Sequence, residues 1–200
     1  FVAKVFFPMP SLNFKQHPNK IAVVTGANSG LGLASTQQLA EHGVHVIMAC
    51  RNIEKCNTAK LELMDQDTHY KLTCMLLDLS SFRSVQLFSM KYLKMFNRLD
   101  ILMLNGGIIA PHSMTIDHIE KTFQVNYLSH FLLAQLLLPM LQRNPNQHAR
   151  IVSVSSDAHS YSYKEGILGS WNNIDNMLSA INNENRTNMA QNYAQAKLAN

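Results

Sequence analysis

A tyrosine and a lysine stand four positions apart near the end of the chain, in the stretch Tyr193-Ala-Gln-Ala-Lys197. On a helix this spacing places both side chains on one face, one turn apart. A tyrosine hydroxyl with a pKa of about 10 is a poor base at neutral pH, and a neighbouring ammonium lowers that pKa because it favours the phenolate. The pair could therefore exchange a proton with a substrate hydroxyl. Alone, this spacing is common and carries little information.

A glycine-rich segment near the start of the chain could bind a phosphate group. It reads Thr25-Gly26-Ala27-Asn28-Ser29-Gly30-Leu31-Gly32, after an apolar run and before a helix-like stretch. Glycine lets the backbone turn tightly and approach a pyrophosphate, and the amides at a helix N-terminus favour its negative charge. We therefore expect a cofactor-binding turn, the alternative being a tight turn without a ligand. Its candidate contacts are Gly26, Asn28, Ser29, Gly30, Leu31 and Gly32.

Short apolar runs alternate with longer helix-like segments from residue 20 onward. Strands are expected over residues 20–25, 44–49, 72–77, 101–104 and 151–155. Helices are expected over residues 31–41, 53–64, 80 or 81 to 95, and 116–141. Strands that alternate with helices form a parallel sheet covered on both faces. The sequence therefore predicts an α/β fold, a Rossmann-type doubly wound parallel sheet of strand order 3-2-1-4-5. The ligand is expected where that order reverses, between strands 1 and 4.

The predicted domain organisation has three parts. Residues 1–19 are expected to form an N-terminal arm, because three prolines interrupt regular structure there. Residues 20–200 are expected to form a single dinucleotide-binding domain. Within it, residues 157–189 are rich in Ser, Asn and Tyr and break the alternation. We expect an insertion beside the site, with a short helix near 174–181, and a solvated insert without a catalytic role is the alternative.

Composition argues against several other classes of protein. A hydrophobic content of 46% and a charged content of 15% are typical of a folded chain. The net charge of +4 comes from scattered Lys and Arg, which favours a basic enzyme surface over nucleic-acid binding.

The three cysteines lack CxxC spacing, which favours a reducing compartment. The nine histidines lack zinc spacing, so no metal site is expected. No apolar run reaches the roughly 20 residues that span a bilayer. We expect a cytoplasmic protein, although a chain that starts with Phe could lack an upstream targeting segment.

The order of these motifs resembles one enzyme family. A TGxxxGxG turn, an Asn-Gly pair, a strand that ends in Ser and a YxxxK pentad together resemble the short-chain dehydrogenase/reductase family, over residues 20–200. The segments most like its branch of retinol dehydrogenases and WW domain-containing oxidoreductases are Ala49-Cys50-Arg51-Asn52, Phe123-Gln124-Val125-Asn126 and Ile151-Val152-Ser153-Val154-Ser155-Ser156. No WW domain is present in these residues. The resemblance implies an oxidoreductase that interconverts an alcohol and a carbonyl by hydride transfer with a nicotinamide cofactor.

Four side chains are the candidate catalytic residues. Tyr193 would take the alcohol proton or return it, and Lys197, by resemblance, would also hold the nicotinamide ribose. Ser156 follows a buried strand, where its hydroxyl could bind the substrate oxygen; its neighbour Ser155 is the next candidate, and Ser153 a weaker one. The fourth candidate is Asn126. The resemblance implies that it holds a water molecule that relays protons from Lys197 to solvent. The alternative is a core amide whose hydrogen bonds are satisfied within the protein.

The residues after the second strand bear on the choice of cofactor. An acidic residue there would bind the NAD ribose and repel a 2′-phosphate, but this chain carries Cys50-Arg51-Asn52. We therefore expect NADP(H) in preference to NAD(H), with Arg51 on the phosphate; an ion pair of Arg51 with a surface carboxylate is the alternative. The resemblance implies that Asp78 and Leu79 border the adenine, and Asp78 could also cap a helix. Asn105 and Gly106 follow the fourth strand, and Gly106 stands where the family usually has Ala, which could loosen this wall of the site.

Two departures from the family pattern leave a second function open. Ser156 and Tyr193 are 37 positions apart, more than in most members, and the chain stops three residues after Lys197, where the family continues. The fold is therefore expected to be C-terminally truncated, with strand 5 as an exposed edge. The alternative function is a non-catalytic dinucleotide-fold fragment that acts in binding or partner contacts. The expected partners are a small or lipophilic alcohol, aldehyde or ketone and a second copy of the chain.

Overall fold

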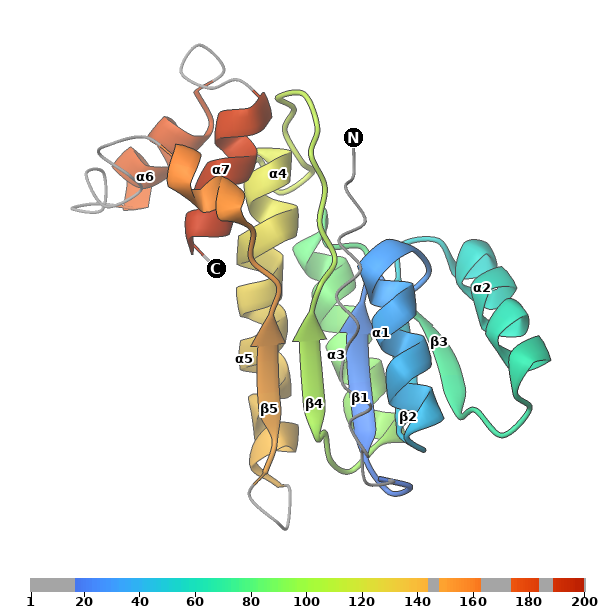
Figure 1. The fold of residues 1–200 in the computed structure, drawn as a ribbon. Helices are drawn as coiled ribbons and strands as arrows, with labels where there is room; N and C mark the ends of the chain where they lie inside the picture. The colour runs from blue at the N-terminus through green and yellow to red at the C-terminus, as the bar shows by residue number, and fades with distance from the viewer. Residues whose placement is uncertain (1–16, 144–147, 163–173, 184–188, 200) are drawn as a thin grey trace.

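The central strand of the sheet is the apolar run between Lys20 and Gly26. The computed structural model of the protein describes residues 17–143, 148–162, 174–183 and 189–199. Its strands are β1 (Ile21–Thr25), β2 (His45–Cys50), β3 (Leu72–Leu76), β4 (Ile101–Leu104) and β5 (Arg150–Ser153). Neighbouring strands are parallel and their order is β3-β2-β1-β4-β5 (Figure 1). This confirms the predicted fold and strand order.

Helices connect the strands and cover both faces of the sheet (Figure 1). They are α1 (Gly30–Glu41), α2 (Ile53–Gln66), α3 (Phe82–Met95), α4 (Lys121–Phe123), the π-helical turn η1 (Gln124–Leu128), α5 (Ser129–Gln142), the 3-10 helix η2 (Asp157–Tyr161), α6 (Ile174–Ile181) and α7 (Met189–Ala199). The first two lie on one face, and α3 and α5 lie on the other. In the described ranges, no helix has the length and apolar character needed to cross a membrane.

The two faces of the central strands pack against different helices. Val23, Ile47 and Leu102 are fully buried with α3 and α5, whereas Ala22 and Val24 are buried with α1 and α2. Burial on both faces explains why these strands are continuous apolar runs without polar alternation. The edge strand β5 is exposed at each of its residues, as expected for a strand with one neighbour.

Side-chain caps begin the helices that follow β2 and β3. The Asn52 side chain accepts a hydrogen bond from the Lys55 amide at 2.7 Å and begins α2. The Ser81 hydroxyl accepts one from the Ser84 amide at 3.3 Å and begins α3. Each bond satisfies an amide that has no partner within its helix. The predicted cap at residue 80 or 81 is therefore Ser81.

The long helix predicted over residues 116–141 begins later than expected. Its first turn is α4, where the Glu120 carboxylate accepts a hydrogen bond from the Phe123 amide at 2.8 Å. The helix continues through η1 into α5, and Pro139 is accommodated near its C-terminal end. The prediction was wrong at the N-terminus because Ile116 and Ile119 have helical spacing but lie in the turn before the cap.

The predicted insertion at residues 157–189 is described in part. Its described helices are η2 and α6, and α6 coincides with the short helix predicted near 174–181. In Figure 1 both lie close to α7, beyond the carboxyl end of β5. The remainder of the insertion, and residues 1–16 of the predicted N-terminal arm, lie outside the described residues.

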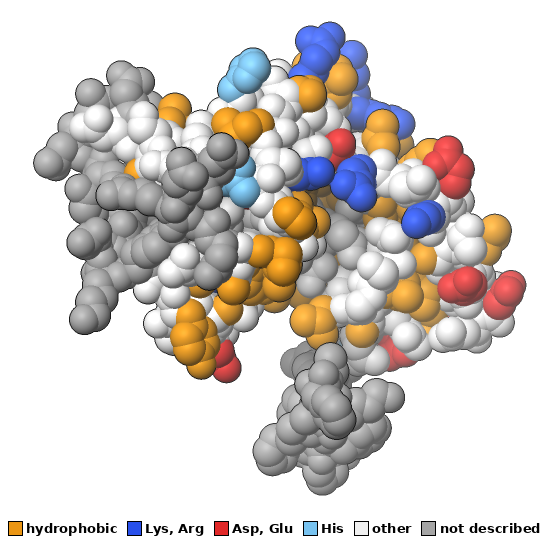
Figure 2. Space-filling model, turned by 90° about the horizontal axis from the view of Figure 1, so that it is seen from above, with side chains coloured by type: hydrophobic (Ala, Val, Ile, Leu, Met, Phe, Trp, Pro, Cys, Tyr) orange, Lys and Arg blue, Asp and Glu red, His pale blue; other side chains and the backbone are white. Residues whose placement is uncertain are grey.

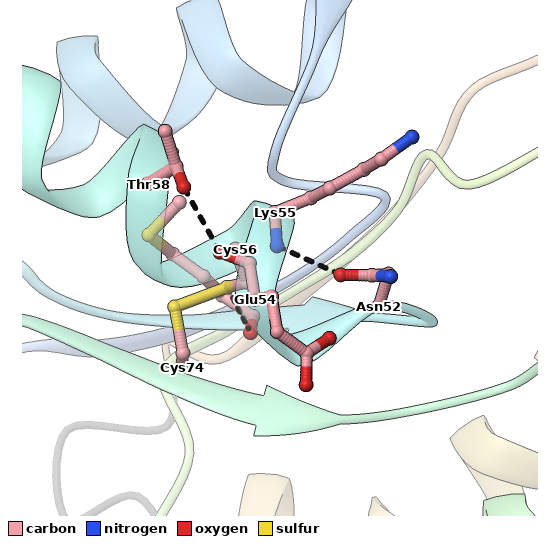
Figure 3. The surroundings of a disulfide bond; sticks show 7 residues. Asn52, Glu54, Lys55, Cys56, Thr58 and Cys74 are labelled. Carbon is pink, nitrogen blue, oxygen red and sulfur yellow. Dashed lines mark hydrogen bonds between the residues drawn. A yellow bond between two sulfur atoms is a disulfide. The ribbon is translucent and has the colours of Figure 1, made fainter.

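Two of the three cysteines are joined by a disulfide (Figure 3). Cys56 on α2 and Cys74 on β3 are 18 positions apart in the sequence, and their Cα atoms lie 6.0 Å apart. This corrects the expectation of reduced cysteines. The absence of CxxC spacing says nothing about pairs that form because a helix packs over a strand. Cys50, at the end of β2, is free and buried.

Reduction of the Cys56–Cys74 disulfide is expected to lower the free energy of unfolding by about 3 kcal/mol, the loop-closure value for a loop of about this length. Urea unfolding with and without a dithiol reductant measures this change. The Cys56→Ala/Cys74→Ala double variant is the control, because its midpoint should not respond to reductant. In the unfolded wild type, thiol titration should find one thiol before reduction and three after it. Three thiols before reduction would contradict the disulfide.

Candidate functional site

The glycine-rich turn joins β1 to α1 at the carboxyl edge of the sheet. Gly26 has a φ of +65°, and a Cβ atom there would stand 2.9 Å from the Gly106 Cα. A Cβ atom on Gly32 would overlap the Gly26 carbonyl oxygen. Gly26 and Gly32 must therefore be glycine, because backbone segments approach each other here without room for a side chain.

The first turn of α1 is open to an anion. Ser29 precedes the helix, but its side chain makes no capping hydrogen bond to the first amides. Ser29, Gly30 and Leu31 are exposed, Leu31 to 71% of its surface. Amides at a helix N-terminus without a side-chain cap can donate to a phosphate group. The predicted contacts at residues 26–32 thus form one continuous turn with the chemistry that a diphosphate needs.

Thr25 links the turn to the segment after β4. Its hydroxyl oxygen accepts hydrogen bonds from the Asn105 amide at 2.9 Å and the Gly106 amide at 2.8 Å. The Asn105 side chain in turn donates to the Thr25 carbonyl at 2.9 Å. These bonds join the ends of β1 and β4, where the strand order reverses. Ligands of open α/β sheets bind at this position.

Tyr193 and Lys197 lie on α7 and meet as their spacing predicts. The Lys197 ammonium lies 5.8 Å from the centroid of the Tyr193 ring. It also donates a hydrogen bond to the Val154 carbonyl, just beyond β5, at 2.5 Å. Lys197 is only 6% exposed, and this burial lowers the pKa of its ammonium. The structure thus places a buried ammonium beside the ring of a half-buried phenol.

The serine pair that follows β5 lies beside the same helix. The Ser155 hydroxyl donates to the Lys197 backbone carbonyl at 3.1 Å and so ties α7 to the end of the strand. The Ser156 hydroxyl accepts a hydrogen bond from the Ala158 amide at 3.2 Å and caps η2. Its proton is not used by that bond and can be donated to a ligand. Ser153, the weaker candidate, is the last residue of β5.

Asn126 is fully buried in the π-helical turn η1. Its side-chain oxygen accepts from the Ile108 amide at 2.8 Å, and its side-chain nitrogen donates to the Ile108 carbonyl at 2.9 Å. The amide thus holds the loop after β4, which matches the interpretation of Asn126 as a satisfied core residue. A water relay would have to use the backbone carbonyl of Asn126. Short π-helical turns are frequent at functional sites.

The comparisons with known proteins agree with this geometry. The family model for short chain dehydrogenases matches residues 20–168. The chain belongs to the short-chain dehydrogenase family. It is 37% identical to short-chain dehydrogenase TIC 32 B, chloroplastic, of Brassica napus, over 90% of the chain and 54% of that protein. It is 40% identical to the human WW domain-containing oxidoreductase over 80% of the chain and 39% of that protein. For mouse retinol dehydrogenase 13 the identity is 41%, over 71% of the chain and 42% of that protein.

Solved structures share the fold. A protein from Mycobacterium paratuberculosis superposes with a TM-score of 0.71 at 29% identity, over 93% of this chain and 60% of that one. A short chain dehydrogenase from Shigella flexneri complexed with NADP superposes with a TM-score of 0.66 at 22% identity, over 90% of this chain and 67% of that one. This short-chain dehydrogenase chain spans about half the length of the curated relatives it matches.

The end of β2 carries the residues predicted to choose the cofactor. Arg51 is exposed, and within the described residues no carboxylate forms an ion pair with it. The surface ion pair considered as an alternative is therefore not formed with any carboxylate in the part of the chain that the structure describes. Figure 2 shows Lys and Arg side chains gathered on the face at the carboxyl ends of the strands. Beside Arg51, burial raises the pKa of the Cys50 thiol to about 11, so this thiol stays protonated.

Asp78 and Leu79 form the turn after β3. The Asp78 carboxylate accepts hydrogen bonds from the Ser80 amide at 2.9 Å and the Ser80 hydroxyl at 2.7 Å and so closes a turn before the helix. The helix cap considered for Asp78 is Ser81 instead. The Leu79 carbonyl accepts a hydrogen bond from the Ser129 hydroxyl at 2.6 Å. The first turn of α5 thus holds the turn after β3 in place.

Gly106 is the departure from the family's usual alanine. Its amide is held by the Thr25 hydroxyl, so the segment is anchored despite the missing side chain. A Cβ atom at residue 106 would stand 3.0 Å from a Leu79 methyl carbon and 3.3 Å from the Thr25 hydroxyl oxygen. Because these contacts are tight, the glycine fits the close packing between the ends of β1, β3 and β4.

Sequence reasoning missed two polar residues of the site. Thr25 heads the glycine motif but was assigned no role. His130 lies four positions after Asn126, a spacing that puts both on one helix face and that could have drawn attention to it. The imidazole is 2% exposed, and its Nε2 lies 2.9 Å from the Thr25 hydroxyl oxygen. Only the folded structure brings these two residues together, because they are 105 positions apart.

Gly32→Ala is expected to weaken binding of a nicotinamide dinucleotide by about tenfold or more, a loss of at least ~1.4 kcal/mol. The added methyl group would displace the Gly26 carbonyl and therefore move the turn. Fluorescence titration with NADPH measures the affinity. Gly43→Ala is the control, since Gly43 lies at the other end of α1 and an added side chain is strained there by its φ of +77° but cannot move the turn. Equal affinity of the Gly32→Ala variant and the wild type would contradict this role of the turn.

Proposed function

We propose that this chain carries the cofactor and catalytic site of an NADP(H)-dependent oxidoreductase that interconverts an alcohol and a carbonyl. The observation that carries the proposal is the buried Lys197 ammonium, 5.8 Å from the Tyr193 ring and next to the end of β5. A buried charge is costly, and it is retained where it changes the chemistry of a neighbour.

The residues at the carboxyl edge of the sheet fit a nicotinamide dinucleotide. The open first turn of α1 suits its diphosphate, and the segments after β3 and β4 border that turn. On the adenosine side these segments contribute Asp78 and Leu79, and toward the nicotinamide they contribute Asn105 and Gly106. When bound, the cofactor supplies the hydride acceptor or donor.

Tyr193 is the proposed proton acceptor in oxidation and donor in reduction. The Lys197 ammonium lies beside its ring and would stabilise negative charge that develops on the oxygen as the proton is transferred. An ammonium has three N–H donors, of which one is used on the Val154 carbonyl, so two remain for ribose hydroxyls and a water molecule. Ser156 donates its free proton to the substrate oxygen and stabilises the charge that develops there.

Asn126 is proposed to act through its backbone. Its side chain is used on Ile108, so the carbonyl oxygen would hold a water that passes protons from Lys197 toward solvent. A carbonyl oxygen has two lone pairs, and this one accepts a single side-chain hydrogen bond, from His130. The relay therefore requires that the second lone pair accept the water and not a backbone amide of the helix.

A lipophilic alcohol, aldehyde or ketone is the proposed substrate class, as the names of the retinol dehydrogenase relatives suggest. The cytoplasm is the location proposed from the sequence, and the Cys56–Cys74 disulfide counts against it because disulfides are rare in reducing compartments. A second copy of the chain is a proposed partner through α5 and α7. The competing hypothesis is a non-catalytic dinucleotide-fold fragment. It predicts NADP(H) binding, or partner binding, without turnover of any alcohol or carbonyl by the full-length protein. A screen of both substrate classes with both cofactors separates the two hypotheses.

Tyr193→Phe is expected to lower kcat by at least about 100-fold, the low end for a general acid–base group, and to leave the NADP(H) affinity within about twofold. The variant removes only the hydroxyl that exchanges the proton. Turnover and fluorescence titration on the full-length protein measure the two quantities. Tyr161→Phe is the control, because Tyr161 is 78% exposed on η2. Wild-type turnover by the Tyr193→Phe variant would rule out this mechanism.

Arg51→Ala is expected to weaken NADPH binding by about 10- to 100-fold, the range of a charge-assisted hydrogen bond, and to leave NADH binding almost unchanged. The guanidinium contacts only the 2′-phosphate in this proposal. Parallel titrations with both cofactors measure the difference. Arg150→Ala is the matched control, since Arg150 is exposed at the amino end of β5. An equal loss of affinity for NADPH and NADH would mean that Arg51 does not bind the 2′-phosphate.

A further inference from the structure

His130 occupies a central position beneath the cofactor turn. It lies in the first turn of α5 and is 2% exposed. Both ring nitrogens have partners: Nε2 lies 2.9 Å from the Thr25 hydroxyl oxygen, and Nδ1 lies 3.2 Å from the Asn126 carbonyl oxygen. The imidazole therefore connects the end of β1 to the π-helical turn.

The partners determine which nitrogen carries the proton. A carbonyl oxygen can only accept, so the N–H of His130 must be on Nδ1 and point to Asn126. A neutral imidazole has one N–H, so Nε2 is an acceptor and the Thr25 hydroxyl donates to it. The Met103 carbonyl is another acceptor for that hydroxyl, but at the longer distance of 3.4 Å.

This hydrogen-bond direction explains how one hydroxyl holds two amides. With its proton directed to His130, the Thr25 oxygen has two lone pairs, and these accept the Asn105 and Gly106 amides at 2.9 Å and 2.8 Å. A protonated imidazole would present a third donor to the same oxygen. The junction of β1 and β4 is therefore complete only while His130 is neutral.

The environment keeps the ring neutral. Burial lowers the pKa of His130, the hydrogen bond to the Asn126 carbonyl opposes this, and the Lys197 ammonium on α7 adds to the lowering, so that the net pKa is about 4. On its own helix, the neighbouring Ser129 and Asn126 are uncharged. At neutral pH the imidazole is thus an uncharged acceptor for Thr25.

We propose that His130 is a positioning residue, which orients the Thr25 hydroxyl toward itself and thereby sets the Asn105–Gly106 segment and the Asn126 carbonyl for the site. It acts through these groups and is not itself proposed to touch the cofactor. The effect on cofactor affinity rests on the proposed function, whereas the hydrogen-bond arrangement does not.

The first test observes the hydrogen bonds without any cofactor. Nitrogen-15 NMR of the histidine rings should find His130 as the Nδ1–H tautomer at pH 7. Amide exchange at Asn105 and Gly106 should be at least about tenfold faster in His130→Leu than in the wild type, because the hydroxyl loses its directing acceptor. His130→Gln offers an acceptor near the Nε2 position and should recover much of the protection. Tyr92→Phe is the matched control, as it removes another buried hydrogen bond, to the Arg98 carbonyl, away from the site.

The second test measures a pH profile. The pKa of His130 in the folded protein is below its ordinary value of about 6.5, so the unfolded chain takes up this proton first as the pH falls. The stability that the neutral ring contributes is therefore present above about pH 6.5 and is lost as the pH falls toward about 4. The difference in Tm between wild type and His130→Leu should narrow over this window, whereas the difference for Tyr92→Phe should stay constant.

The third test links the residue to the site. His130→Leu should weaken NADP(H) binding about tenfold at pH 7, and Tyr92→Phe should leave it unchanged. An Nε2–H tautomer, or exchange rates in His130→Leu equal to those in Tyr92→Phe, would overturn the inference. If the wild type binds no NADP(H), the proposed function fails, but tautomer and exchange still decide the role of His130.

Discussion

The Thr25 hydroxyl joins the ends of the two neighbouring strands β1 and β4 at the edge of the sheet where open α/β folds bind their ligands. The Thr25 oxygen accepts the amides of Asn105 and Gly106, so the ends of β1 and β4 stay in contact where the strand order reverses. The glycines around this point are required because the same backbone segments approach at distances that exclude a side chain. The glycine turn, the open first turn of α1 and the loop after β4 all depend on this junction.

One helical segment supports that junction from below. Asn126 holds the loop after β4, Ser129 holds the turn after β3, and His130 holds Thr25 at the end of β1. The three side chains lie within two turns of helix and are almost fully buried. Each uses a polar group inside the core, which is costly unless it is satisfied, and each is satisfied by the backbone or side chain of a loop that borders the site.

The candidate site was predictable where local spacing carries the information. Tyr193 and Lys197 lie one helical turn apart, and Gly26 and Gly32 belong to one tight turn, so their proximity follows from their spacing in the sequence. Residues that meet through packing were not predictable. Cys56 and Cys74 pair because α2 lies over β3, and Ile116 has helical spacing although the Glu120 cap starts the helix later. The three hydrogen-bonding roles of Thr25 were likewise invisible, since its partners lie about 80 to 105 positions away.

The amino-acid sequence by itself determined the alternation of strands and helices, the parallel sheet with its order, and the motifs that belong to the short-chain dehydrogenase family. These follow from short-range rules: burial on both strand faces, helical spacing and the freedom of glycine. The tertiary structure alone decided the use of each polar group: the Asn126 amide on Ile108, the Lys197 ammonium on Val154 and the His130 ring on Thr25. The physical reason is that a hydrogen bond depends on distance and direction between atoms, and for distant residues only the packed fold sets both.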